Sequence, residues 1–155
     1  MAELSQRSKK LLRRAGWFEG RTHEVADFVR LLESQGYPVF PAVVEFLRKF
    51  GGLRIENPLA KRPAAEDWHF DVAKASRNIS VKRIQALYVP RVDSNLCIIG
   101  EADKDYITLM MDEKGRVYGG FEETLVFLGD SGEEAIDQLG SENYGQPIDG
   151  PDDSS

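Results

Sequence analysis

Cysteine and histidine are scarce in this chain of 155 residues, which contains one cysteine, Cys97, and two histidines, His23 and His69. A single cysteine excludes an internal disulfide and favours a reducing, intracellular compartment. Zinc sites need three or four side-chain ligands, and these two histidines do not have a spacing typical of such a site. The sequence therefore predicts no metal site.

Long apolar runs are also missing. No stretch approaches the ~20 apolar residues that a membrane-spanning helix needs. Residues 1–7 lack the apolar segment of a secretory signal. We therefore expect no membrane partner and a cytoplasmic location.

The short motifs through which many enzymes bind nucleotides, metals or acyl groups are absent too. The chain contains no G-x-G-x-x-G, G-x-x-x-x-G-K-[ST], H-E-x-x-H or G-x-S-x-G. We predict no catalytic residues, no cofactor and no small-molecule substrate. One enzymatic alternative stays open, in which His69 and Asp71 act as an acid–base pair, although a surface or capping role for His69 is favoured.

Basic residues are rare in the second half of the chain. Residues 1–92 carry 17 Lys or Arg and 10 Asp or Glu, a net charge of +7, whereas residues 93–155 carry 3 and 16, a net charge of −13. This asymmetry indicates a charged partner for one half, although two solvated faces would give the same composition. The basic run at 5–15 has no aromatic residues among its charges, and a chain of net charge −6 repels phosphate, so we expect no nucleic-acid partner.

The clearest pattern that is present is a helix over 41–50 followed by a strand. Four apolar side chains recur at the spacing of one buried helix face. They are Val43, Phe46, Leu47 and Phe50. Proline suits the first helical position, 41, and we expect Gly51 to end the helix in the left-handed conformation. Apolar and polar residues then alternate over 53–56, which predicts a strand.

Patterning and turn residues predict the other elements. Helices are expected at 5–15, at 24–35 after a Thr22 cap, and after a Ser131 cap as far as Gly140. Residues 80–88 form either another helix, capped by Ser80, or a strand. The second half is otherwise predicted to be antiparallel sheet. The expected strands are 68–72, 96–101, 105–112, 116–121 and 124–129.

Several local features have structural explanations. Trp17 and Phe18 are expected to plug one end of the core, and Cys97 to be a buried, inert thiol. Gly119 and Gly120 lie inside a predicted strand and indicate a bulge. Residues 1–140 are expected to form one domain. Residues 141–155, with four acidic and no basic side chains, are expected to be a disordered acidic tail, or at most a loosely docked one.

The sequence pattern that best indicates a function is the concentration of acidic residues on the connections of the predicted sheet. The predicted partner-binding residues are Glu101, Asp103, Asp105, Asp112, Glu113, Glu122 and Glu123. We expect these carboxylates to form one exposed flank whose field speeds association with a basic protein. Nucleases and other toxins that act on nucleic acids are commonly basic, so an acidic inhibitor suits them.

Seven short motifs, taken in their order and spacing, resemble the SUKH superfamily of bacterial immunity proteins, in particular its third branch. They are AGW (15–17), GR (20–21), FLRKFGGL (46–53), IGE (99–101), MDEKGRVY (111–118), LG (128–129) and EAI (134–136). The resemblance covers about residues 10–140. The chain departs from a typical member in its loop at 57–67 and in its acidic tail.

The resemblance implies an α+β fold, with a curved antiparallel sheet flanked by N-terminal helices and a C-terminal helix. It also implies a non-enzymatic protein that binds and neutralises a cognate protein toxin of a bacterial polymorphic or contact-dependent toxin system. Family glycines and aromatic residues carry over as scaffold, whereas partner contacts do not, because members face different toxins. A second hypothesis is a regulatory or scaffold module of the same fold that binds cellular proteins.

Overall fold

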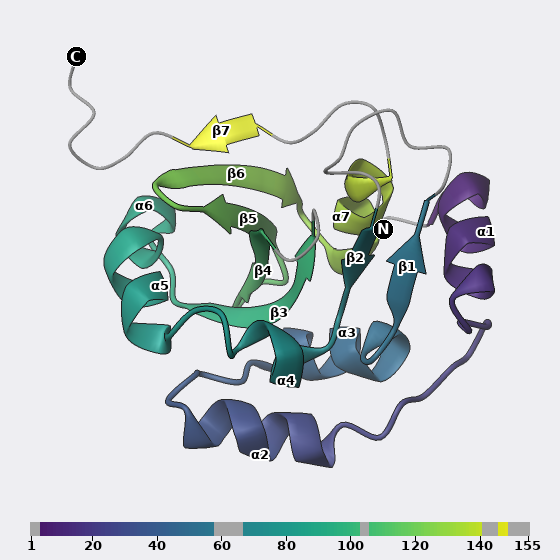
Figure 1. The fold of residues 1–155 in the computed structure, drawn as a ribbon, viewed down its shortest axis with the longest axis horizontal. Coiled ribbons are helices and arrows are strands. Elements are labelled where there is room, and N and C mark those ends of the chain that lie inside the picture. Colours follow the sequence, from purple (N-terminus) through teal and green to yellow (C-terminus); the bar gives the residue numbers. More distant parts are fainter. Residues whose placement is uncertain (1–3, 58–66, 103–105, 141–145, 149–155) are drawn as a thin grey trace.

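The structure, a computed structural model, describes residues 4–57, 67–102, 106–140 and 146–148. Figure 1 shows helices gathered around one curled sheet. In chain order the elements are α1 (Gln6–Arg14), α2 (Ala26–Ser34), α3 (Pro41–Phe50), β1 (Arg54–Glu56), β2 (Asp67–His69), α4 (Val72–Ala75), α5 (Val81–Leu87), α6 (Val89–Val92), β3 (Leu96–Ala102), β4 (Ile107–Asp112), β5 (Val117–Phe121), β6 (Thr124–Gly129), α7 (Gly132–Leu139) and β7 (Gln146–Ile148). This arrangement confirms the α+β prediction.

The sheet is an antiparallel meander. Its seven described strands lie in chain order from β1 to β7, and each pairs antiparallel with the next. The β4–β5 pair is the predicted hairpin, and Gly115 in its turn has the expected positive φ, +88°. The ladder is irregular between Ile98 and Gly100 in β3. Such an irregularity bends a strand, which fits the curl seen in Figure 1.

The predicted bulge at Gly119 and Gly120 is wrong. Both glycines pair in regular register with β4, Gly119 opposite Leu109 and Gly120 opposite Thr108. The β5–β6 ladder is irregular instead between Val117 and Tyr118, where Leu128 is the extra residue in β6. Both glycines allow a close approach by a neighbouring side chain. A Cβ at Gly119 would lie 3.1 Å from Ile107 Cγ2, and one at Gly120 would lie 2.6 Å from Tyr88 Cζ.

The junction between α3 and β1 forms largely as predicted. All four residues of the expected apolar face of α3 are buried, and its proline lies in the first turn. Ile55 is buried between exposed Arg54 and Glu56. The left-handed glycine is Gly52, with φ of +81°, and not Gly51. Gly51 is required for close packing, because a Cβ there would lie 2.4 Å from the carbonyl oxygen of Leu47.

Serine residues cap three of the helices. Ser5, Ser80 and Ser131 accept backbone N–H bonds at the starts of α1, α5 and α7, and α5 resolves the open choice at 80–88 in favour of a helix. The predicted Thr22 cap is wrong, because α2 begins four residues later without a side-chain cap and Thr22 donates to the Gly20 carbonyl oxygen. No helix in the described part of the chain is long and apolar enough to cross a membrane.

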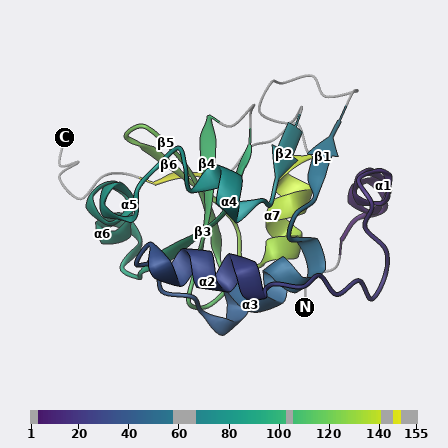
Figure 2. The same cartoon turned by 60° about the horizontal axis from the view of Figure 1, so that its bottom comes forward.

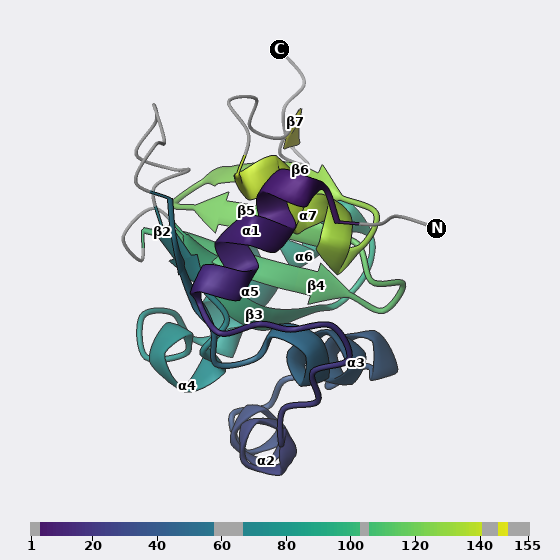
Figure 3. The same ribbon diagram turned by 90° about the vertical axis from the view of Figure 1, so that its right-hand side faces the viewer.

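The helices cover different sides of the sheet. Figure 3 shows α1 crossing beside α7, and α2 and α3 lying together below the sheet. The α1–α7 contact is fixed by Asp137, whose Oδ1 accepts hydrogen bonds from the backbone N–H and hydroxyl of Ser5. The short helices α5 and α6 lie at the far side of the curl, next to β5 and β6 (Figure 1).

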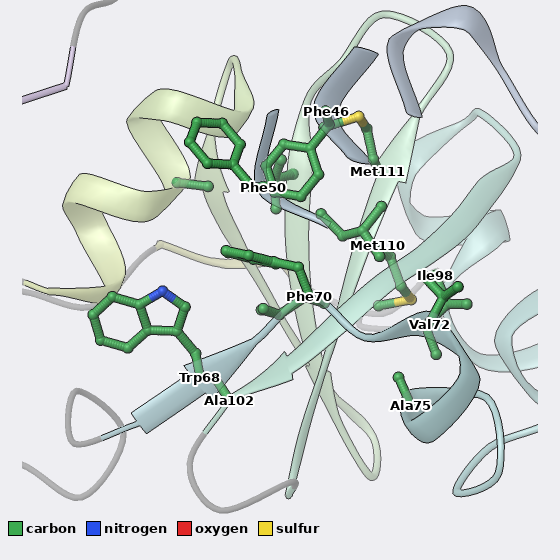
Figure 4. Packing of buried hydrophobic residues seen from close by; sticks show 14 of the residues in the cluster. Phe46, Phe50, Trp68, Phe70, Val72, Ala75, Ile98, Ala102, Met110 and Met111 are labelled. Carbon is green, nitrogen blue, oxygen red and sulfur yellow. The ribbon is translucent and has the colours of Figure 1, made fainter. Parts of the chain in front are cut away.

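The core is one cluster of buried side chains between the sheet and the helices, and Figure 4 shows the part that includes α3 residues Phe46 and Phe50. Phe46 meets Phe70 edge-on, with their ring centroids 4.8 Å apart. Trp17 is buried and stacks on Phe50 at 6.3 Å, which confirms its predicted role as a plug. The same prediction is wrong for Phe18, whose side chain is 59% exposed.

One strand lies within the segment expected to be a disordered tail. Residues 146–148 form β7, which pairs with β6 through Val126 opposite Pro147. The rest of 141–155 lies outside the described residues. The same holds for most of the 57–67 loop.

Candidate functional site

One end of the sheet brings together exposed aromatic and acidic residues. Thr108 pairs with Gly120, and β5 turns into β6 directly after Phe121. The start of β4 and the β5–β6 turn therefore lie at the same end of the sheet, the upper end in Figure 2. We name this region the hairpin end. It is defined by Tyr106, Phe121, Glu122 and Glu123.

The side chains of the hairpin end are open to solvent. Tyr106 is 68% exposed and Phe121 is 44% exposed, and Phe18 is the other exposed large hydrophobic residue in the described part of the chain. Glu122 and Glu123 are exposed, and neither carboxylate forms a salt bridge within the described ranges. Exposed aromatic side chains are typical of protein interfaces.

Tyr88, which lies between α5 and α6, and Arg91 of α6 hold the β5–β6 turn in place. The Tyr88 hydroxyl donates to the carbonyl oxygen of Glu122 at 2.7 Å, and Arg91 Nη1 donates to that of Glu123, also at 2.7 Å. The Tyr88 ring lies directly over Gly120, where a Cβ would be 2.6 Å from Tyr88 Cζ. Gly120 is therefore needed so that this ring can approach the strand. Burial raises the pKa of Tyr88, so its hydroxyl stays protonated and able to donate.

The prediction that Glu101 lies on an exposed flank is wrong, because its side chain is fully buried. Its Oε1 lies 2.9 Å from His69 Nε2, and its Oε2 accepts a hydrogen bond from Asn78 Nδ2 at 2.7 Å. His69 is buried as well, contrary to the expected surface role, and its Nδ1 accepts the N–H of Asp71 at 3.0 Å. These residues join β2, β3 and the segment after α4.

The same correction applies to Asp112, which is also fully buried. Its Oδ1 accepts the backbone N–H groups of Lys114 and Arg116, each at 2.9 Å. Its Oδ2 accepts from Arg116 Nε at 2.7 Å. Asp112 therefore organises the β4–β5 turn from inside, and its carboxylate does not face a partner.

The remaining acidic residues do not form a single flank. Glu113 is exposed in the β4–β5 turn, at the opposite end of β5 from Glu122 and Glu123. Asp103 and Asp105 lie outside the described residues. Of the five predicted residues that the structure describes, Glu113, Glu122 and Glu123 are exposed, and the two that share one turn, Glu122 and Glu123, are neighbours in sequence.

A model of the SUKH-3 immunity protein family matches residues 4–142 of the chain. The chain belongs to this family. The match supports an immunity role and confirms the resemblance drawn from the short motifs. No curated protein and no solved structure gives a significant match.

The glycine–arginine motif of this SUKH-3 chain closes the end of α3. Arg21 donates from Nη1 to the Lys49 carbonyl oxygen at 2.8 Å and from Nη2 to that of Gly51 at 2.9 Å. The backbone N–H of His23 donates to the Arg48 carbonyl oxygen at 2.7 Å. These bonds satisfy carbonyl groups that the helix itself leaves free, and the guanidinium complements the negative end of the helix dipole.

A groove of about 490 Å³ lies beside this helix end, between α1, residues 17–22 and the start of α7. Trp17 and Phe50 line it, and both are buried. The charged groups around it pair with one another. These pairs are Lys9 with Glu19, Arg48 with Glu45, and Lys49 with Glu133. Because these charged groups already pair with one another, the groove presents fewer unpaired charges to a ligand than the hairpin end does.

Metal and thiol chemistry have no assembled site in the described part of the SUKH-3 chain. None of its groups of His, Cys, Asp and Glu could hold a metal ion. Cys97 is fully buried in β3, as predicted, and burial raises the pKa of its thiol to about 12. The thiolate that would act as a nucleophile is therefore absent at neutral pH.

Sequence reasoning missed the aromatic residues of the hairpin end. Phe121 follows an alternating strand pattern that gives no indication of which face is covered. Tyr106 falls within the predicted strand 105–112, whereas β4 begins at Ile107. The adjacent Gly119 and Gly120 were the available signal, because paired glycines inside a strand also mark a place where another group approaches closely.

Proposed function

We propose that this protein binds and neutralises a cognate toxin of a bacterial polymorphic or contact-dependent toxin system, within the cytoplasm of the producing cell. The observation that carries the proposal is the SUKH-3 immunity family match over residues 4–142. Neutralisation occurs by occupying the toxin's working surface. The protein itself performs no chemical step on the toxin.

The arrangement of the reactive side chains supports an inhibitor that acts by binding. Both ring nitrogens of His69 have partners inside the protein. The thiol of Cys97 is buried and protonated. Asp71, the other half of the suggested acid–base pair, caps α4 by accepting the N–H of Lys74. These groups hold the fold together, which supports surface contact as the means of action.

The proposed toxin is basic and acts on nucleic acid. Support comes from the net charge of −6, which arises entirely from the second half of the chain. Glu113, Glu122 and Glu123 are acidic and exposed in that half. Opposite charges raise the rate of association and discriminate against other partners. An acidic inhibitor is therefore suited to a nuclease-like toxin.

The gene beside the one encoding this chain provides the test. We expect it to encode a toxin whose expression stops growth, and co-expression of this chain to restore growth. The purified chain should capture the toxin in a pull-down, whereas an unrelated toxin serves as the negative control. If no toxin gene is adjacent and the chain instead captures a cellular protein, the regulatory or scaffold function replaces the immunity function.

A further inference from the structure

We propose that the hairpin end is the surface that docks the toxin. Tyr106 and Phe121 enter apolar recesses of the toxin, and Glu122 and Glu123 face its Lys or Arg side chains. This inference rests on the proposed function and assigns a surface to it.

The two aromatic side chains provide the apolar part of the contact. Within the described residues, exposed large hydrophobic side chains occur at three positions, and two of these belong to the hairpin end. A tyrosine and a phenylalanine at the end of one sheet can bury a large apolar area with few rotatable bonds to fix. Interfaces concentrate their binding free energy in such anchors.

The two carboxylates determine the charge of the partner. Glu122 and Glu123 are adjacent, exposed and without salt bridges among the described residues. Arg83 and Arg91 lie near the Tyr88 hydroxyl, so the region around the turn is not uniformly acidic. Arg91 nevertheless donates to the backbone of the turn, and the charges on the turn residues themselves are both negative. The complementary partner therefore places cations against the turn.

The turn is also held rigid before any partner arrives. Its two carbonyl oxygens accept hydrogen bonds from Tyr88 and Arg91, and the buried Tyr88 ring packs on Gly120. A preorganised surface loses little conformational entropy on binding, which favours affinity. Glu122 has φ of +52°, a conformation that two-residue turns usually assign to Gly, Asn or Asp. A glutamate thus occupies a position where backbone preference alone would favour Gly, Asn or Asp.

The test measures the affinity of full-length variants for a catalytically inactive form of the toxin encoded by the adjacent gene. We expect Tyr106→Ala and Phe121→Ala each to raise Kd at least about tenfold. The double charge reversal E122K/E123K should slow association several-fold, mainly at low salt. Matched controls are Phe18→Ala, which removes an exposed aromatic elsewhere, and Glu113→Lys, which reverses an exposed charge at the other end of β5. Both controls should change Kd less than about twofold.

A second measurement separates lost contacts from lost folding. Amide hydrogen exchange of the wild-type protein should slow at 106–108 and 119–124 when the inactive toxin is added. Wild-type binding with unchanged affinity in all hairpin-end variants and no such protection would overturn the surface while the proposed function stands. Absence of any wild-type binding would overturn both.

Discussion

At the scale of single residues, the buried carboxylate of Glu101 illustrates how acidic side chains serve the fold. His69 Nδ1 accepts a backbone N–H, so it carries no proton, and the ring proton lies on Nε2. Nε2–H then donates to Glu101, whose second oxygen accepts from Asn78. The carboxylate is fully buried but satisfied by two donors, as a buried charge must be.

Replacing this carboxylate should therefore destabilise the protein strongly. Glu101→Ala leaves the donors of His69 and Asn78 without their acceptor, and we expect the free energy of unfolding to fall by about 2–4 kcal/mol. Urea denaturation measures the change. The matched control, Glu113→Ala, removes an exposed carboxylate and should alter stability by less than about 0.5 kcal/mol. Equal effects of the two substitutions would contradict the assignment of Glu101 to the interior.

Because of Cys97, the free energy of unfolding should decrease as the pH rises through the alkaline range. Burial raises the pKa of its thiol from 9.0 to about 12, so the native state retains a proton that the unfolded state loses above pH 9. The resulting stability is fully present below pH 9 and is lost as the pH rises toward 12. We expect the free energy of unfolding to decline over this range and the decline to be smaller in Cys97→Ala. An identical slope in both proteins would show that other groups, such as Tyr37 and Tyr88, account for it.

At the scale of elements, the end of α3 depends on a side chain from a distant loop. Arg21 satisfies two carbonyl oxygens at this helix end, and its positive charge opposes the helix dipole. These hydrogen bonds join the motif at 20–21 to the motif at 46–53, which explains why both belong to one series although they are about 30 residues apart.

Loss of the guanidinium should weaken this junction. We expect Arg21→Ala to lower the free energy of unfolding by about 1–3 kcal/mol, because two hydrogen bonds from a charged donor are removed. Arg48→Ala is the control, since Arg48 is exposed and pairs with Glu45 on the same helix; such a pair contributes at most ~0.5 kcal/mol. Thermal or urea unfolding distinguishes the two. A loss no larger than that of the control would rule out capping by Arg21.

The β5–β6 hairpin is a second element whose conformation depends on a residue distant in sequence, Tyr88. A methyl group at Gly120 would overlap the Tyr88 ring, which is buried and hydrogen-bonded and so cannot move freely. We expect Gly120→Ala to reduce stability by about 1–3 kcal/mol, measured by urea unfolding. Gly140→Ala is the control, because the added methyl would meet nothing closer than 3.6 Å. If Tyr88→Ala removes the penalty of Gly120→Ala, overlap with the ring is the cause.

At the scale of the whole molecule, sequence patterns predicted the elements better than the surface. The period of α3 and the turn glycine of the β4–β5 hairpin identified both elements, because each depends on neighbouring residues. The burial of Glu101 and Asp112 could not be predicted in this way. The strands β3 and β4 are buried on both faces, so alternation does not separate inside from outside. Tyr88 over Gly120 is likewise a contact between distant segments.

The acidic residues that the structure describes in the second half of the chain do not gather on one side of the folded molecule. Two of the predicted carboxylates are internal, and the exposed Glu113 lies away from Glu122 and Glu123. A net charge of −13 in residues 93–155 therefore does not become one acidic face. The negative charge offered to a partner at the hairpin end is local, so its reversal should change the association rate several-fold, less than the reversal of one continuous acidic face would.

The most direct test of inhibition by binding is a titration of the purified, active toxin with the purified protein. We predict that toxin activity falls linearly and reaches background at one equivalent, and that both chains are recovered chemically unchanged from the complex. Complete inactivation by a small fraction of an equivalent, with a modified toxin, would instead show that the protein is a catalyst. Full toxin activity at any excess would show that it is not the partner of that toxin.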